Sequence, residues 1–238
     1  MMKAARSGKP ICMPSSWRNI PWGEYYRMAI ELRLQNWWPK IYGFHMLKLG
    51  QLSAELDTKS SMVSHQVNVT TTTTNTDVMA SLNYLPFENK SVDVCLMAHV
   101  LDYSADPHWL LREADRVLVD DGWIILSSFN PISLLGIGKC TPILRHKQPY
   151  YCRMFSLRRQ VDWLSVLNYE VITQQNFQIM PFSRPVKRDG KRYHVGGCLN
   201  LILARKRTLP LTPTAMKFAL PRMSVKGRVL GATRNRPD

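Results

Sequence analysis

The stretch that decides the fold is Val92–Phe129, VDVCLMAHVLDYSADPHWLLREADRVLVDDGWIILSSF. Its first segment, Val92–Val100, is almost continuously apolar, as expected for a strand buried on both faces of a parallel sheet. Asp106-Pro107 then places a capping carboxylate and a proline at the start of a helix. Asp120-Asp121-Gly122 is expected to end that helix, with the glycine in the left-handed conformation. Trp123–Phe129 is a second buried strand, so the stretch predicts a β-α-β unit with a right-handed crossover.

The segments on both sides of this unit continue the alternation of strands and helices. The apolar spacing predicts a helix over Glu24–Lys40, strands at Phe44–Leu49, Val63–Val69 and Val78–Leu82, a helix over Ser156–Asn168, and late strands at Tyr169–Phe177 and Cys198–Ala204. The last two strands could pair antiparallel. The threonine run Thr70–Thr74 and the segment Asn130–Tyr151, which is rich in glycine and proline, are predicted to be loops. The whole pattern predicts an α/β fold.

Composition indicates the number of domains and the compartment. A chain of 238 residues, 45% of them hydrophobic, has the length and the core of one α/β domain. We expect an N-terminal helical extension over residues 1–42, the domain over 43–205 and a basic tail over 206–238. No apolar stretch is expected to span a membrane or to act as a secretory signal. The five cysteines are scattered without metal-ligand spacing, so we expect no metal and a cytoplasmic, reducing environment.

The formal net charge of +15 is the main anomaly of the composition. Much of the excess lies late, in Lys187–Arg192, in Arg205–Arg207 and along the tail. A strongly basic protein attracts polyanions, because neutralising phosphates releases condensed counterions. Two interpretations stay open: a solvated tail, or a contact with nucleic acid. The sequence indicates no oligomeric state.

A set of short motifs in fixed order and spacing runs from Leu85 to the strand at Trp123. They are Leu85-Pro86-Phe87, Ser91-Val92-Asp93-Val94, His99-Val100-Leu101, Asp106-Pro107, Leu111-Arg112-Glu113, Arg116-Val117-Leu118, Gly122 and Trp123–Ser128. In these motifs the chain resembles the class I S-adenosylmethionine-dependent methyltransferases, in the branch called methyltransferase type 11. Over nearly its whole length it resembles a group of uncharacterised gammaproteobacterial proteins of this type, through Pro21-Trp22-Gly23, Tyr42-Gly43-Phe44, Phe129-Asn130-Pro131 and Asp162-Trp163-Leu164.

This resemblance implies a fold, a cofactor and a place for it. The fold would be a Rossmann-like α/β sheet of seven mostly parallel strands in the order 3-2-1-4-5-7-6, with the last strand antiparallel and helices on both faces. The cofactor would be S-adenosylmethionine, lying across the carboxyl ends of the first strands at the topological switch point. The methyl acceptor is unknown, because the segments around Phe129–Tyr151 and Pro181–Val195 would set it.

The first cofactor motif of the family is an acidic residue followed by a glycine-rich loop, which lets the backbone approach the cofactor. Here it corresponds to Leu47–Ala54, and Gly50 is the glycine that remains. Lys48 stands where an acid is usual, and Leu52 stands where the second glycine belongs. Lys48 would place like charge near the methionine ammonium, at a cost of about 1 kcal/mol in water and several at lower dielectric. Gly50 is either a cofactor contact or a simple turn.

The resemblance carries four further cofactor positions and one candidate base. Asn68 aligns with the acid that accepts the ribose hydroxyls, and Ser81 with the acid that contacts the adenine, with Leu82 beside it. Ala98 would flank the methionine moiety at the end of the Val92 strand. His99 would lie near the methyl group, as a general base close to its natural pKa. The structural alternatives are turn residues for Asn68 and a strand-capping histidine for His99.

Two hypotheses of different class follow. The first is an active methyltransferase, on the strength of the ordered motifs after Leu85. The second is a catalytically inactive protein of the same fold that serves as a basic binding or scaffold module, possibly on RNA, because Lys48, Leu52, Asn68 and Ser81 replace the usual residues. The first requires Lys48 and Leu52 to lie outside the cofactor groove, whereas the second expects Leu52 to fill it.

Overall fold

The computed structural model describes residues 11–73, 76–141, 147–178 and 196–207, all within one compact unit. The basic run Lys187–Arg192, most of the predicted tail and the segment Pro181–Val195 lie outside the described residues. Within the described part of the chain, no helix is long and apolar enough to cross a membrane, and no group of three or more potential metal ligands occurs.

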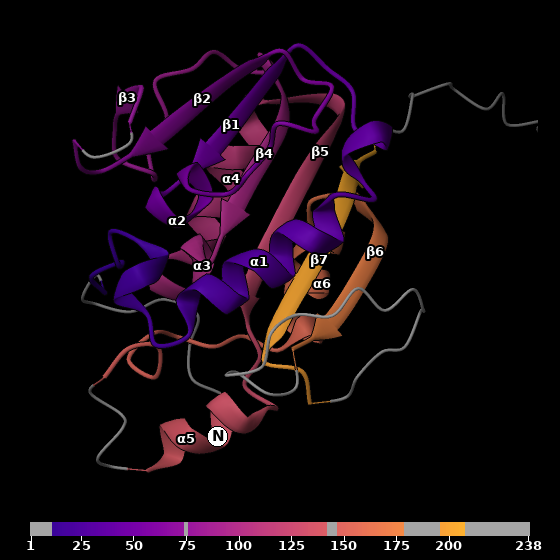
Figure 1. Ribbon diagram of the computed structural model, residues 1–238. Coiled ribbons are helices and arrows are strands. Elements are labelled where there is room, and N and C mark those ends of the chain that lie inside the picture. Colours follow the sequence, from indigo (N-terminus) through magenta and orange to yellow (C-terminus); the bar gives the residue numbers. More distant parts are fainter. Residues whose placement is uncertain (1–10, 74–75, 142–146, 179–195, 208–238) are drawn as a thin grey trace, which may run out of the picture. The chain divides into compact units, whose positions relative to one another are not determined.

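The described residues form a seven-stranded sheet with the order β3-β2-β1-β4-β5-β7-β6 (Figure 1), which confirms the predicted fold. The strands are β1 (His45–Leu49), β2 (His65–Thr70), β3 (Val78–Met79), β4 (Val92–Ala98), β5 (Leu118–Phe129), β6 (Tyr169–Phe177) and β7 (Leu199–Lys206). Strands β1 to β5 pair in parallel, and β7 is antiparallel to both β5 and β6.

The helices are short, and one of them forms in a segment that the sequence predicted to be a loop. They are α1 (Gly23–Leu34), α2 (Gln51–Ala54), α3 (Val100–Tyr103), α4 (Pro107–Val117), α5 (Leu134–Cys140) and α6 (Leu157–Val166), with single 3₁₀ turns at Trp17–Asn19 and Trp38–Lys40. Helix α5 lies in the segment that the sequence predicted to be a loop. Its N-cap Ser133 accepts the N–H of Gly136, and a side chain at Gly136 would collide with the carbonyl of Pro131. A glycine there permits a close approach, so it does not break the helix.

The unit that decides the fold forms as predicted, except at the end of its helix. Asp106 caps α4, because its Oδ1 accepts the N–H of Trp109 at 3.1 Å. The helix ends at Val117, and the prediction that Gly122 caps it is wrong. Strand pairing with β4 already begins at Leu118, so the residues after it belong to β5. The left-handed conformation falls on Asp121, with a φ of 64°.

Successive side chains of each strand point to opposite faces of the sheet and pack into two apolar clusters, one on each face. On one face α1 lies across the sheet (Figure 1), and its Tyr26, Ile30 and Leu34 pack with Phe129 of β5. On the other face α4 and α6 supply Leu111 and Leu164, among others, to a second cluster. Burying a side chain of this size contributes about 1.5–3 kcal/mol, so the two clusters hold the strands in place.

The described part of the late basic sequence is used within the molecule. Arg205 donates from Nε to the carbonyl of Asp121 at 3.0 Å, and Lys206 donates from Nζ to the carbonyl of Asp115 at 2.8 Å. Arg207 forms an ion pair of 2.6 Å with Glu170. These three cations therefore tie the end of β7 and the residue after it to neighbouring elements, and part of the late basic sequence is used in contacts within the molecule.

Candidate functional site at the carboxyl edge of the sheet

The carboxyl ends of β1 to β4 meet at one edge of the sheet, because these strands are parallel and adjacent. After β1 the chain moves to β2 on one side, and after β3 it returns to β4 on the other side. Ligands of open α/β sheets bind at such a reversal of strand order. Gly50 follows β1, Ser81 and Leu82 follow β3, and Ala98 ends β4 immediately before His99. The structure thus brings these predicted residues to one edge.

Gly50 keeps the backbone geometry that a glycine loop needs. Its φ is 83° and its ψ 158°, a conformation that residues with a side chain rarely adopt. Its N–H donates to the carbonyl of Val69 at 2.8 Å, which holds the turn beside the end of β2. A Cβ at this position would lie 3.0 Å from Val100 Cγ2 and 3.0 Å from Met13 Cε. The backbone angle therefore favours glycine, and a side chain would also be tight against Val100 and Met13.

The strand register adds a residue that sequence reasoning missed. Lys48 pairs with Asn68 and Leu49 with Val69, so the next pair of positions is Gly50 and Thr70. Thr70 is the last residue of β2, fully buried, and its Oγ1 donates to the carbonyl of Thr72 at 2.6 Å. Asn68 lies two residues earlier, and its Oδ1 is buried without a hydrogen-bond partner. The signal that points to Thr70 is the pairing of β1 with β2, which the sequence alone does not contain.

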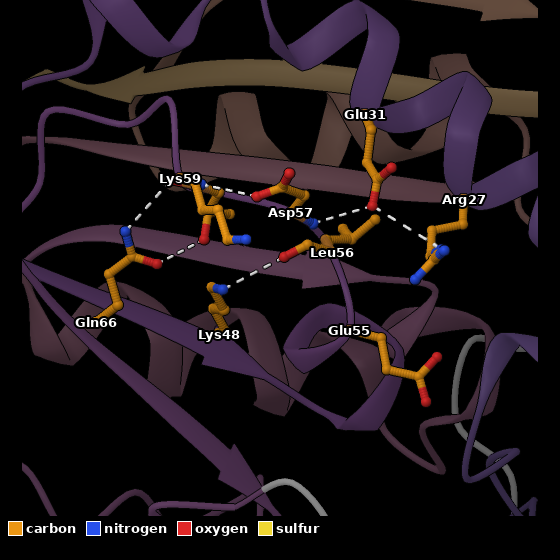
Figure 2. A pocket seen from close by; sticks show the side chains of 9 residues that line it. Arg27, Glu31, Lys48, Glu55, Leu56, Asp57, Lys59 and Gln66 are labelled. Atoms are coloured by element: carbon orange, nitrogen blue, oxygen red, sulfur yellow. Dashed lines mark hydrogen bonds and ion pairs between the residues drawn. The ribbon is translucent and has the colours of Figure 1, made fainter.

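Lys48 lines a pocket together with residues of α1 and of the segment after α2 (Figure 2). Its Nζ donates to the carbonyl of Leu56 at 3.4 Å. The pocket has a volume of about 550 Å³, and its other lining residues are Arg27, Glu31, Glu55, Leu56, Asp57, Thr58, Lys59 and Gln66. Burial lowers the pKa of the Lys48 ammonium, and the nearby carboxylates of Asp57 and Asp77 oppose that change. The net effect is a lowered pKa, with burial as the largest cause.

The pocket carboxylate of Glu31 is occupied by its neighbours. Its Oε1 accepts the N–H of Asp57 at 2.9 Å and lies 3.9 Å from Arg27 Nε (Figure 2). Burial raises the pKa of Glu31, whereas the N–H of Asp57 and the charge of Arg27 lower it. These contacts link α1 to the segment after α2. The pocket therefore lies where α1 is attached to the rest of the domain.

The glycine loop is tied to the neighbouring strands by side chains of α2. Ser53 donates from Oγ to the carbonyl of Leu49 at 2.5 Å and accepts the N–H of Ala98 at 2.7 Å. The Gln51 side chain donates to the hydroxyl of Thr72, in the segment that follows β2. Leu52 is fully buried in the apolar cluster under α1. The loop that corresponds to the family's glycine motif is therefore well anchored.

Ser81 and Leu82 form a turn after β3 at the periphery of this edge. The carbonyl of Ser81 accepts the N–H of Tyr84 at 3.0 Å, and its side chain is exposed. Leu82 is half-buried and packs against the cluster that contains α4. Both residues follow β3 closely, and β3 pairs with β2. Their role in contacting an adenine stays a prediction.

His99 and Asp102 form a buried pair directly after β4. His99 Nδ1 lies 2.9 Å from Asp102 Oδ2, and both side chains are fully buried. The same carboxylate oxygen accepts the N–H of Phe129 at 2.9 Å. His99 has a φ of 58°, an uncommon conformation for a residue with a side chain, which costs of order 1 kcal/mol or more. The pair also has two atoms without a hydrogen-bond partner, His99 Nε2 and Asp102 Oδ1.

The surroundings of this pair set its electrostatics. Burial raises the pKa of Asp102, and the hydrogen bonds from His99 and Phe129 oppose that rise. The ring of His99 lies 4.0 Å from the ring of Phe129 and meets the edge of Trp17 at 5.3 Å. In the tautomer with its hydrogen on Nδ1, His99 donates to the Asp102 carboxylate and Nε2 is left as an acceptor. Such an arrangement can hold and move one proton.

Comparisons with known proteins agree with this architecture. A family model described as "Methyltransferase domain" matches residues 44–126. The chain is 49% identical over 237 residues to the uncharacterised protein YafS of Escherichia coli, an alignment that covers 98% of this chain and 97% of the relative. It is 32% identical over 87 residues to the demethylmenaquinone methyltransferase of Chlamydia pneumoniae, which covers 37% of this chain and 33% of that protein.

Solved structures with a similar fold have low sequence identity. One is described as an S-adenosylmethionine-dependent methyltransferase and possible histamine N-methyltransferase from Thermotoga maritima. It has a TM-score of 0.56 and 19% identity, and the alignment covers 77% of this chain and 95% of that chain. Another is an S-adenosylmethionine-dependent methyltransferase from Archaeoglobus fulgidus, with a TM-score of 0.54, 18% identity, and coverage of 76% of this chain and 94% of that one.

Proposed function

The chain belongs to the class I S-adenosylmethionine-dependent methyltransferases, and we propose that it is an active member, which transfers a methyl group at the carboxyl edge of β1–β4. One observation carries the proposal: the parallel strands bring Gly50, Ala98 and His99 together where the strand order reverses. We infer an acceptor whose nucleophilic atom carries a proton, because His99, directly after β4, has an Nε2 without a hydrogen-bond partner.

Three features of the site fit the family's cofactor, S-adenosylmethionine. Gly50 retains a positive φ and a backbone that a ligand can approach closely. The ammonium of Lys48 donates to the carbonyl of Leu56 in the pocket beside α1, a contact that we expect to reduce the like-charge repulsion suggested by the sequence. The buried Oδ1 of Asn68 has no hydrogen-bond partner, and a ribose hydroxyl is a donor of the kind it lacks. We propose that cofactor binding uses these residues.

The remaining cofactor contacts follow from position. Gly50 and Ala98 would flank the methionine end, Asn68 and Thr70 the ribose, and Ser81 and Leu82 the adenine. When bound, the cofactor supplies a methyl group that its sulfonium already activates. The chain's own task is therefore to align the acceptor and to exclude water.

His99 would act as the general base for the acceptor, with Asp102 as its positioning residue. The 2.9 Å contact between Nδ1 and Asp102 Oδ2 fixes the tautomer that leaves Nε2 free. The acceptor's proton passes to Nε2 while its nucleophilic atom attacks the methyl carbon. Proton transfer by a positioned side chain contributes about 10²–10⁴-fold to a rate. The apolar ring of Phe129, whose centroid lies 4.0 Å from that of His99, would help to exclude water from this proton.

The organisation of the rest of the chain is also proposed. The extension over residues 1–42 and the domain over 43–205 agree with α1 packing on a sheet that starts at His45, and the tail over 206–238 lies mainly outside the described residues. We retain the reducing cytoplasm as the compartment, because all five cysteines are free.

Calorimetry with S-adenosylmethionine and S-adenosylhomocysteine, together with a fluorescence melt, tests the function. We expect heat of binding and a raised melting temperature, because a ligand that binds the native state stabilises it. Gly50→Ala should weaken binding strongly, because a side chain is disfavoured at a φ of 83° and its Cβ would stand where the cofactor has to approach the backbone. Gly196→Ala is the matched control: Gly196 also has a positive φ, of 111°, but nothing lies within 4 Å of its Cβ position. No heat and no melt shift at millimolar ligand would exclude an active enzyme and leave the scaffold hypothesis.

A further inference from the structure

Met13 lies on the open side of the proposed cofactor loop. A Cβ on Gly50 would stand 3.0 Å from Met13 Cε and 3.3 Å from Met13 Sδ. The Met13 side chain packs against both apolar clusters, the one under α1 and the one under α4. It therefore bridges the two faces at the edge of the sheet. A thioether and its methyl group occupy the space that a glycine in this loop leaves free for a ligand.

The residues after Met13 fasten this segment to α2 and to the buried pair. The indole Nε1–H of Trp17 donates to the carbonyl of Leu52 at 2.9 Å, within the glycine-motif region. The backbone N–H of Trp17 and the hydroxyl of Ser16 both donate to Glu55 Oε2, at 3.1 and 3.2 Å. The edge of the Trp17 ring covers His99, at a centroid distance of 5.3 Å. The segment thus covers both the cofactor loop and the candidate base.

We propose that Met13–Trp17, here called the occupying segment, is an intramolecular occupant of the cofactor groove. The thioether of Met13 takes the place of the methionine end of S-adenosylmethionine, and the segment withdraws before the cofactor binds. The inference rests on the proposed function, because it concerns access to the same groove. The apparent affinity of the intact protein is then lowered by the fraction of molecules in which the segment is withdrawn.

The substitution Met13→Ala removes Sδ and Cε, the atoms that face Gly50, and leaves the bonds of Trp17 intact. Calorimetry with S-adenosylhomocysteine should show tighter binding to this variant than to the intact chain, by about fivefold to tenfold for the loss of a competing half-buried contact. Ile11→Ala is the matched control, since Ile11 lies two residues before Met13, is also half-buried and packs on the cluster under α1. Its affinity should equal that of the intact chain. A melt of each variant confirms that it is folded.

A second measurement, by nuclear magnetic resonance, uses the full chain without any substitution that could destabilise it. The ¹³C-labelled ε-methyl signal of Met13, assigned by its absence in the Met13→Ala variant, should move when S-adenosylhomocysteine is added. Equal affinities for all three proteins, with an unmoved Met13 signal, overturn the inference and leave the proposed function standing. Weaker binding by Met13→Ala also overturns it, because Met13 would then be part of the binding wall. Absence of binding by every protein, including Met13→Ala, overturns the proposed function itself.

Discussion

Replacing Asp102 by asparagine tests the buried pair at almost constant shape. The carboxylate oxygen Oδ2 accepts from His99 Nδ1 and from the N–H of Phe129, each at 2.9 Å, and a carboxamide oxygen can accept both bonds. A hydrogen bond to a charged group contributes about 1.5–3 kcal/mol, against about 0.5–1.5 for a neutral one, so each bond loses about 1 kcal/mol. In return, the variant no longer buries a carboxylate.

The sign of the pH dependence follows from the pKa of Asp102. Burial raises that pKa above its usual value, more than the two N–H donors lower it. The native state therefore keeps the proton more tightly than the unfolded chain. Through this group the free energy of unfolding is highest at low pH and falls as the pH rises from about 3.9 through the raised native pKa. Within that window the loss approaches about 1.4 kcal/mol per pH unit.

The assay is urea unfolding, followed by tryptophan fluorescence at a series of pH values between acid and neutral. The free energy of unfolding of Asp102→Asn, minus that of the wild type, should rise with pH across the window, because asparagine does not ionise. A difference that stays flat, or that falls with pH, would refute the argument. A falling difference would mean that the native state lowers the pKa of Asp102, as in an ion pair with a charged His99.

Three more predictions concern the site and the helix of the central unit. Lys48→Met should leave the affinity for S-adenosylhomocysteine unchanged within about twofold, because the ammonium lies on the α1 face; a large gain would mean that its charge reaches the groove. Thr70→Val should weaken the affinity for S-adenosylhomocysteine by about twofold to tenfold, the loss of one neutral hydrogen bond. If calorimetry finds a weakened affinity in Asn68→Ser and none in Thr70→Val, the ribose contact belongs to Asn68 instead. Asp106→Ala should lower the free energy of unfolding by about 1 kcal/mol through loss of the N-cap, and an unchanged urea midpoint would contradict that role.

The parts of the fold that the sequence predicted are those determined by local signals. The continuous apolar run of β4 and the Asp106 cap of α4 needed no knowledge of distant residues. The end of α4 depended on pairing between β4 and Leu118, so a turn-like sequence at Asp120-Asp121-Gly122 was misleading. Helix α5 was missed because its glycines, Gly136 and Gly138, are typical of a loop. In the structure they leave room for the carbonyl of Pro131 and for the ring of Tyr150, contacts that the local sequence does not show.

In the candidate site, too, the residues that follow an evident strand could be located from the sequence, whereas those that depend on distant contacts could not. His99 and Ala98 were located from the end of an evident strand, and the spacing of three residues between His99 and Asp102 could have suggested a pair on one turn. The position of Thr70 beside Gly50 depends on strand register, which a single sequence does not fix. The contact of Met13 with Gly50 joins segments separated by the whole of α1, so no local pattern could predict it.

The departures from the family's glycine motif each have a physical consequence. Lys48 bonds the segment after α2 on the α1 face, and Leu52 packs in the cluster under α1 while its carbonyl accepts the Trp17 indole. Leu52, at the place of the second glycine, therefore holds the N-terminal extension, whereas Lys48 ties β1 to the segment after α2. The loss of that glycine and the docking of the occupying segment thus meet at Leu52. Gly50, the glycine that remains of the family's motif, keeps a positive φ, and its Cβ position lies 3.0 Å from Met13 Cε, so we expect segment and cofactor to compete at this residue.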